Sequence, residues 1–295
     1  MIHLTCPVCL APLSPDIQQK GLQCPSGHRF DQARQGYVNL LLSQHKKSKQ
    51  PGDDAEMVTA RREFLDTGLY QPIADALVEL IAAHAKNLIS NNSLCYSDIA
   101  CGEGYYTEKI ATGISRTLSR ESNSPADDVK VVTTGIDIST PAIKSATRRS
   151  KTIQWLVASA NRLPIETQSQ NIASCMFCRI DHSEVERILP PQGLFIVASA
   201  ASGHLLELRQ QLYGDDLKRK PDSAPADLGL LRHMARKQVR FRIQLKEREN
   251  RRQLLRMTPH FWRSRPDAHK RFLDNGSPEL SVDIQLDLYQ KNTSP

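Results

Sequence analysis

The sequence predicts an α/β protein in which a parallel, doubly wound sheet follows a small metal-binding module. Three observations lead to this prediction. Short apolar runs alternate with helical patterns through the middle of the chain, which is typical of a parallel sheet covered by helices. A glycine loop, Cys-Gly-Glu-Gly, follows the first of these runs at residues 101–104. Near the N-terminus stand a Cys-x2-Cys pair and a Cys-x3-His pair.

Length and composition set the broad class. The chain has 295 residues, enough for one large domain and a small module. Apolar residues make up 39% and charged residues 24%, which excludes a wholly disordered chain. The longest apolar run, residues 194–201, is much shorter than the roughly 20 residues that span a bilayer, and the first residues do not resemble a secretory signal. The sequence therefore favours a cytoplasmic protein without a membrane segment.

The net charge of +7 is concentrated in two segments. Residues 232–256 contain ten Lys or Arg against two Glu, and residues 1–50 contain six Lys or Arg against two Asp. Two basic segments on a nearly neutral body suggest a polyanionic partner. Charge alone leaves open the alternative that both segments are solvated surfaces.

The N-terminal motif has the spacing of a metal site. Its residues are Cys6, Cys9, Cys24 and His28, in the pattern C-x2-C-x14-C-x3-H. Zinc takes four such ligands in a tetrahedron, and a site filled by four protein ligands is structural. A disulfide framework is not expected in a reducing compartment. A basic stretch and Pro51-Gly52 follow, so we predict a zinc-binding module over residues 1–50 and an α/β domain over residues 51–295.

The glycine loop has the context of a nucleotide-binding site. A predicted strand ends at Asp98, Gly102 and Gly104 follow, and a helix begins near residue 106. Glycines let the backbone approach a ligand closely, and the helix N-terminus offers free N–H groups. A second strand ends at Asp137, whose carboxylate is placed to accept from ribose hydroxyls.

The remaining elements follow from periodicity and capping. Asp53-x-x-Glu56 predicts the start of a helix, and residues 115–128 are predicted to form an inserted polar loop. Two late, half-exposed antiparallel strands are expected beside the parallel sheet, which suits a class I methyltransferase better than a dehydrogenase. The predicted elements are helices over 53–65, from 72, near 183–188 and over 248–257, and strands over 154–158, 172–178, 194–198, 238–245 and 282–288.

Several longer motifs carry a resemblance to a known family. They are the knuckle Cys-Pro-x-Cys…Cys-Pro-x-x-His at 6–28, Gly-Tyr-Val-Asn-Leu-Leu at 36–41, Gln-His-Lys-x-Ser-x-x-Pro-Gly-Asp at 44–53, Ala-Arg-Arg-x-Phe-Leu-Asp at 60–66, Tyr-Gln-Pro at 70–72, Cys-Gly-Glu-Gly-Tyr-Tyr-Thr at 101–107 and Met-Thr-Pro-x-x-Trp-Arg-x-Arg-Pro at 257–266. Together they resemble the bacterial 23S rRNA (guanine-N1)-methyltransferase family, which includes RlmA. The resemblance covers nearly the whole chain.

The resemblance implies a class I (Rossmann-like) S-adenosylmethionine-dependent methyltransferase domain, preceded by a zinc ribbon that helps to recognise RNA. It implies methylation of guanine N1 in a hairpin loop of 23S rRNA, and a homodimer. It also implies which residues line the cofactor, and the loop pattern adds two more. The implied residues are Tyr70, Gly102, Glu103, Asp137 and His204, and the loop pattern adds Asp98 and Gly104.

Two departures from the family pattern keep other functions open. Ala100 stands where the family usually has glycine, and Phe177-Cys178-Arg179 replaces a usual aromatic-Ala-Pro segment. One alternative is a non-catalytic RNA-binding protein that keeps the fold, and another is a small-molecule methyltransferase. The residues name no general base; His204 is a candidate only because histidine titrates near neutral pH.

Two further motifs have competing interpretations. Cys175-x-x-Cys178 is better explained as thiols of a central strand than as a metal or redox pair. Phe261 and Trp262 stand among three arginines of residues 256–265. That composition suits stacking on unpaired bases, or an aromatic anchor in the core with solvated arginines around it.

Overall fold

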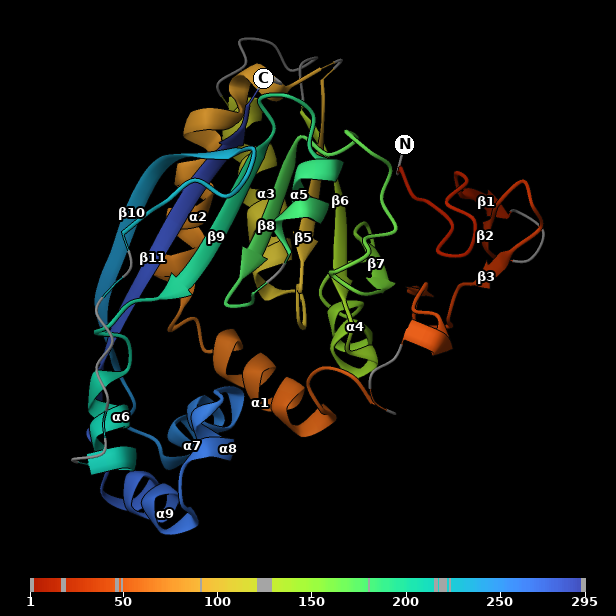
Figure 1. Ribbon diagram of the computed structural model, residues 1–295. Helices are drawn as coiled ribbons and strands as arrows, with labels where there is room; N and C mark the ends of the chain where they lie inside the picture. Colours follow the sequence, from red (N-terminus) through yellow and green to blue (C-terminus); the bar gives the residue numbers. More distant parts are fainter. Residues whose placement is uncertain are drawn as a thin grey trace.

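The structure is a computed structural model that describes residues 3–16, 20–45, 48, 50–90, 92–120, 129–179, 181–214, 217, 222 and 224–292. A small N-terminal module lies beside one edge of a large sheet, and a group of helices lies beyond the carboxyl ends of its parallel strands (Figure 1). No helix in these ranges is long and apolar enough to cross a membrane.

In the described part, the large sheet has eight strands in the order β10-β11-β9-β8-β5-β6-β7-β4. All of them are parallel to one another except β11, which is antiparallel to both of its neighbours. The two late strands predicted from the sequence are β10 and β11, which pair antiparallel to each other, and β11 is the one that reverses direction relative to the parallel strands. The strands are β4 (Val38–Asn39), β5 (Ser93–Ile99), β6 (Lys130–Asp137), β7 (Gln154–Val157), β8 (Ile172–Met176), β9 (Leu194–Ala200), β10 (Leu231–Gln244) and β11 (Glu279–Lys291).

The strand order changes direction at β5. The chain places β6 and β7 on one side of β5, and β8 and β9 on the other. In open α/β sheets, ligands bind outside the carboxyl ends of the strands at such a switch point. The glycine loop follows β5 directly, so the topology places it where a ligand is expected.

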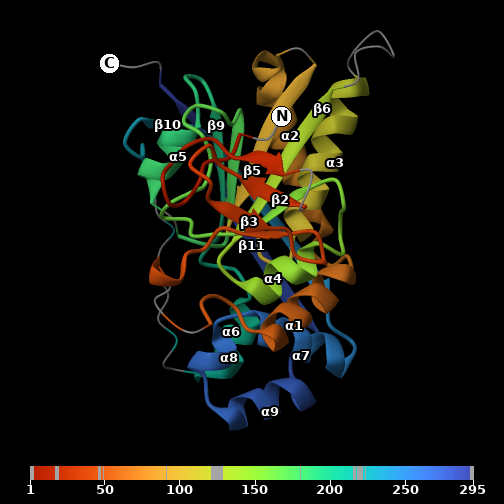
Figure 2. The ribbon, with the colours of Figure 1, turned by 90° about the vertical axis from the view of Figure 1, so that its right-hand side faces the viewer.

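Helices cover both faces of the sheet. On one face lie α2 (Gln71–Ala85) and α3 (Tyr105–Arg120), and on the other lies α5 (His182–Ile188) (Figure 2). The helix α2 buries Ile73, Leu77 and Ile81, which recur at intervals of four and therefore form one apolar stripe. The other described helices are α1 (Ala55–Asp66), α4 (Thr140–Ala146), α6 (Leu206–Tyr213), α7 (Arg248–Met257), α8 (His260–Arg263) and α9 (Pro266–Asn275), with short 3-10 turns η1 (Ser43–His45) and η2 (Lys86–Leu88).

Most helix predictions agree with the structure, with two differences. The prediction for residues 248–257 is confirmed by α7. The N-cap of α1 is Asp54, which accepts from the Met57 N–H at 2.8 Å, so the predicted cap at Asp53 is wrong by one residue. The helix α3 runs to residue 120, so the predicted loop is wrong for residues 115–120; residues 121–128 lie outside the described part.

The N-terminal module shares its core with the large domain. Its own antiparallel sheet consists of β1 (Ser14–Asp16), β2 (Gly21–Gln23) and β3 (Arg29–Asp31). The strand β4 pairs in parallel with β7 at the edge of the large sheet. Buried Leu4, Leu13 and Leu40 belong to one apolar cluster with Leu156 and Ile165. The module is therefore anchored by a strand pairing and by apolar burial.

Candidate functional site

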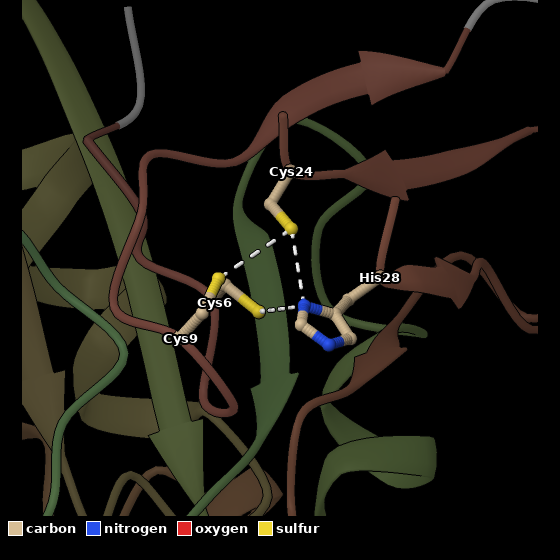
Figure 3. A group of neighbouring side chains, drawn as sticks. All are labelled: Cys6, Cys9, Cys24 and His28. Carbon is tan, nitrogen blue, oxygen red and sulfur yellow. Dashed lines mark hydrogen bonds between the residues drawn. The ribbon is translucent and has the colours of Figure 1, made fainter. Parts of the chain in front are cut away.

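The four predicted metal ligands lie together in the N-terminal module (Figure 3). The Sγ atoms of Cys9 and Cys24 are 3.6 Å apart, and the Nδ1 of His28 is 3.6 Å from the Sγ of Cys6 and 3.3 Å from that of Cys24. Tetrahedral zinc with usual bond lengths separates such atoms by about 3.5–3.8 Å. The cluster therefore fits a zinc ion held by three thiolates and one imidazole.

Local turns set this cluster in place. Gly27 has φ +85° and donates its N–H to the Cys24 carbonyl at 3.0 Å, which brings His28 back beside Cys24. In the first turn, Leu10 donates to the carbonyl of Cys6 at 2.8 Å. A backbone hydrogen bond from Ala11 leads the interactions that lower the pKa of Cys9 to about 6, which favours the thiolate that zinc binds.

The glycine loop takes left-handed conformations at three positions. The φ angles are +59° at Ala100, +57° at Gly102 and +85° at Gly104. Ala100 thus adopts the conformation that glycine usually provides, at a cost of about 1–2 kcal/mol. The loop therefore accommodates alanine at this position in the left-handed conformation.

The two loop glycines differ in what a side chain would meet. A Cβ on Gly104 would lie 2.6 Å from the buried ring of Trp155 and 3.1 Å from the Cβ of Ala146. A Cβ on Gly102 would meet only the end of the Arg61 side chain, at 3.4 Å. Gly104 is therefore required by packing, whereas Gly102 leaves its backbone open to a ligand.

The Asp98 side chain accepts hydrogen bonds from other residues of the protein. Its carboxylate is buried and accepts hydrogen bonds from the hydroxyls of Thr107 and Ser174, the latter at 2.7 Å. Burial raises the pKa of Asp98 to about 6, although both hydroxyls oppose the shift. These bonds tie the end of β5 to α3 and β8. Asp98 therefore positions the loop, and its two oxygens already have protein donors.

Asp137 connects the end of β6 with the glycine loop. Its Oδ2 accepts from the Gly102 N–H at 2.9 Å, and its Oδ1 accepts from the Ser139 N–H at 2.8 Å. Burial raises the pKa of Asp137, and the two backbone donors oppose this. Each carboxylate oxygen has a second lone pair, so Asp137 can still accept from a ligand hydroxyl.

The charged residues around the loop include two arginines that sequence reasoning missed. Arg61 of α1 pairs with Asp53 and lies beside Gly102. Arg149 pairs with buried Glu103 at 2.6 Å, so the Glu103 carboxylate is held by the protein itself. The Ala-Arg-Arg motif at 60–62 was the available signal for Arg61. Nothing in the sequence marked Arg149.

Buried phenols near the loop lack partners. The hydroxyls of Tyr70 and Tyr106 are buried and make no hydrogen bond to the described residues. The rings of Tyr70 and His204 have centroids 6.3 Å apart, and the predicted site residues Tyr70 and His204 therefore lie together. A buried hydroxyl without a partner costs free energy unless a ligand or water supplies one. These orphaned groups are what a polar ligand would satisfy.

His204 is held as a neutral imidazole. Burial, with the nearby His260 and Arg209, lowers its pKa to about 3. Its Nδ1 is 3.4 Å from the Asp283 backbone N–H, which assigns the ring proton to Nε2. A histidine that donates from Nε2 and resists protonation is a hydrogen-bond donor, and this opposes its role as the general base.

The end of β8 offers an exposed ring and a thiol. Phe177 has φ +56°, is 44% exposed and packs against Tyr106 with ring centroids 5.9 Å apart. Cys175 is buried on β8, in agreement with the prediction, but Cys178 is exposed. A hydrogen bond with Cys175 is the main cause that lowers the pKa of Cys178 to about 7.

Comparison with known proteins agrees with this architecture. A family model described as "RlmA, N-terminal" matches residues 4–49. A Micromonospora griseorubida protein named "Putative 23S rRNA (guanine-N(1)-)-methyltransferase" is 31% identical over 275 residues, which cover 90% of this chain and 88% of that protein. The Streptomyces fradiae 23S rRNA (guanine(748)-N(1))-methyltransferase is 32% identical over 70% of this chain and 66% of its own. Among solved structures, the Bacillus subtilis YcgJ protein has 14% identity and a TM-score of 0.45, over 74% of this chain and 99% of its own.

The strand order, with a single antiparallel β11, and the loop after β5 define a class I methyltransferase domain. The Cys3His cluster adds a zinc ribbon in front of it. With a relative that matches over most of both chains, the protein belongs to the 23S rRNA (guanine-N1)-methyltransferase family.

Proposed function

We propose that the protein transfers the methyl group of S-adenosylmethionine to N1 of a guanine in a hairpin loop of 23S rRNA. The observation that carries this proposal is the open glycine loop after β5 in a chain that matches its family over most of its length. The alternative of a non-catalytic protein was based partly on Ala100, but Ala100 keeps the glycine conformation. The zinc ribbon and the basic segments do not favour the small-molecule alternative.

The site residues fit the cofactor in chemistry. S-adenosylmethionine supplies an electrophilic methyl group on a positively charged sulfur when it is bound. The remaining lone pairs of the Asp137 carboxylate can accept from its ribose hydroxyls. The hydroxyl of Tyr70 and the Nε2–H of His204 are further donors without a protein partner that is described. We assign Asp98, Glu103 and Gly104 to holding the loop.

The main contribution of the protein to the acceptor guanine is to position it. Guanine N1 carries a proton at neutral pH, so the base must be placed in line with the methyl group while that proton is lost. The neutral, donating His204 is suited to binding and poorly suited to taking the proton. Phe177, exposed at the carboxyl end of β8, offers a ring on which a base that has left its stack can lie.

The N-terminal module and the α/β domain have different roles in this proposal. We propose that residues 1–50 recognise RNA through the zinc ribbon and that residues 51–295 carry the methyl transfer. A cytoplasmic location follows from the rRNA substrate. The homodimer remains a prediction from the family resemblance, and sedimentation of the purified protein tests it.

The decisive experiment is a direct assay for the product. Purified protein is incubated with S-adenosylmethionine and unmethylated 23S rRNA, and the digested RNA is searched for 1-methylguanosine by mass spectrometry. We expect this nucleoside from the wild type and at least about tenfold less from Asp137→Ala, while Lys130→Ala, at the opposite end of the same strand, serves as the control. Cofactor binding without any methylated nucleoside would favour the non-catalytic alternative. Methylation of small molecules at a rate that does not fall with salt would favour the alternative of a small-molecule methyltransferase.

A further inference from the structure

The helices α7, α8 and α9 form a lobe, residues 248–275, that the proposed chemistry does not use. The lobe is inserted between β10 and β11 and packs on α1, beyond the carboxyl ends of the strands (Figure 1). Its apolar core consists of Leu254, Leu255, Ala268 and Phe272. Its outer surface carries an unusual combination of cations and aromatic rings.

A hollow of about 300 Å³ opens on this lobe. No carboxylate is among its lining residues, all of which belong to the lobe. The polar and aromatic residues that line it are Arg248, Arg252, Arg256, Lys270, Phe261 and His269. A second hollow, of about 320 Å³ between α1 and α7, is lined by Glu56 and Glu63 as well as arginines. Only the first hollow is complementary in charge to an anion.

The arginines of the hollow are free to exchange partners. Arg248 pairs with Asp274 at 3.0 Å, and Arg252 pairs with Glu249 at 2.6 Å. The side chains of these two acids are 39% and 49% exposed. Exposed ion pairs contribute little to stability, so a phosphate can displace the carboxylates. Guanidinium groups match phosphate oxygens in pairs.

Aromatic rings stand beside these cations. Phe261 and His269 are stacked, with centroids 5.0 Å apart and planes 18° apart, and the Arg256 guanidinium lies 5.2 Å from the Phe261 ring centre. The rings of Trp262 and Phe261 are perpendicular, with centroids 5.1 Å apart, and Trp262 is 65% exposed. The alternative of an aromatic anchor in the core therefore does not hold for Trp262, most of whose side chain is exposed.

The lobe carries more exposed cations. Arg263, Arg265, Lys270 and Arg271 are exposed and take part in no ion pair found within the described ranges. An acidic peptide would be bound by the cations alone and gives no reason for an exposed indole. An unpaired nucleotide uses both, because its phosphate meets the cations and its base stacks on the ring.

We propose that the lobe is a binding site for a single-stranded segment of the RNA substrate, with phosphate at the hollow and a base stacked on Trp262. The proposal rests on the proposed function for the identity of the RNA. It assigns to α7–α9 a share in substrate affinity, separate from the methyl-transfer site at the glycine loop.

The chain contains a built-in reporter for this contact. It has two tryptophans, Trp155, which is 1% exposed, and Trp262. Titration with a short unstructured RNA of mixed sequence should quench the Trp262 emission, and the Trp262→Phe protein, which retains only Trp155, should show little quenching. Because Phe keeps an aromatic face, Trp262→Phe should bind this RNA nearly as well as the wild type.

Affinity and its salt dependence separate stacking from charge. Trp262→Ala should weaken binding of the same RNA by about 5- to 100-fold with an unchanged salt slope. Lys270→Ala should reduce the slope of log affinity against log salt by about 0.7, the value for one phosphate on a single strand. Lys130→Ala, an exposed lysine at the amino end of β6, is the matched control and should change neither quantity.

The outcomes distinguish this inference from the proposed function. Unchanged affinity and salt slope in both Trp262→Ala and Lys270→Ala would overturn the inference, even if the wild type makes 1-methylguanosine. A loss of self-association in Trp262→Ala, with RNA affinity intact, would identify the lobe as a contact between copies and also overturn it. Weakened RNA binding in folded variants supports the inference, even if no methylated nucleoside is found with the wild type. Thermal unfolding of each variant checks that the fold is retained.

Discussion

The two glycines of the loop after β5 should respond differently to the same added methyl group. Gly104→Ala and Gly102→Ala both place a Cβ on a left-handed backbone, at φ +85° and +57°. In Gly104→Ala the new atom also meets the Trp155 ring at 2.6 Å, a distance at which something must shift. In Gly102→Ala it meets only the flexible end of Arg61.

The expected penalties follow from these contacts. The left-handed conformation costs an alanine about 1–2 kcal/mol, and the stiffer unfolded chain returns about 0.4–1 kcal/mol. Overpacking against buried Trp155 adds about 1–3 kcal/mol in Gly104→Ala. We therefore expect Gly104→Ala to lower the free energy of unfolding by about 2–4 kcal/mol and Gly102→Ala by about 1 kcal/mol.

Denaturant unfolding and calorimetric titration with S-adenosylmethionine test both effects. Gly102→Ala should remain folded and lose cofactor affinity, because its methyl group occupies the open side of the loop. Trp155→Phe removes the contacted part of the indole, so the Gly104→Ala penalty should shrink in that background. Equal penalties for the two glycine variants, or a Gly104→Ala penalty unaffected by Trp155→Phe, would refute the packing argument.

Three further predictions concern other sites. Burial, with the nearby His260 and Arg209, lowers the pKa of His204 to about 3, so below about pH 6.5 the unfolded chain takes up a proton that the folded chain does not. The stability that is present above this pH is therefore lost as the pH falls, by about 2 kcal/mol at pH 5. His204→Asn should flatten the measured pH dependence of the free energy of unfolding by that amount. Cys24→Ser should lower bound zinc from one ion per chain to nearly none by metal analysis, with Cys95→Ser unaffected. The hydrogen bond with Cys175 is the main cause that lowers the pKa of Cys178 to about 7, so iodoacetamide at pH 7 should modify Cys178 well before Cys95. Peptide mass spectrometry measures both modification rates, and equal rates would contradict this prediction.

Local signals predicted much of this molecule. The Cys3His spacing, the loop at 101–104 and the helix at 248–257 are each specified by neighbouring residues, and the structure contains all three. The direction of β10 was not available in this way, because its alternating pattern is the same in either orientation. The strand continues back to Leu231, where the alternation is broken by a bulge between His233 and Ala235.

The candidate site was only partly predictable because its partners come from distant segments. Asp98 is a correct member of the loop region, but its two oxygens are satisfied by Thr107 and Ser174, and the latter is on another strand. Arg61 reaches Gly102 from α1, which no spacing rule places over the loop. Helix α9 was missed because its buried side is narrow, with Ala268 and Phe272 as its buried residues.

The pairing of β4 with β7 has a consequence for the edge of the large sheet. Val38 and Asn39 pair with Leu156 and Val157, and Leu40 donates to the Val157 carbonyl at 2.9 Å. Without this cover, β7 would be an edge strand with unpaired backbone groups, and such edges recruit other chains. The N-terminal module therefore also protects this edge of the large sheet from pairing with another chain.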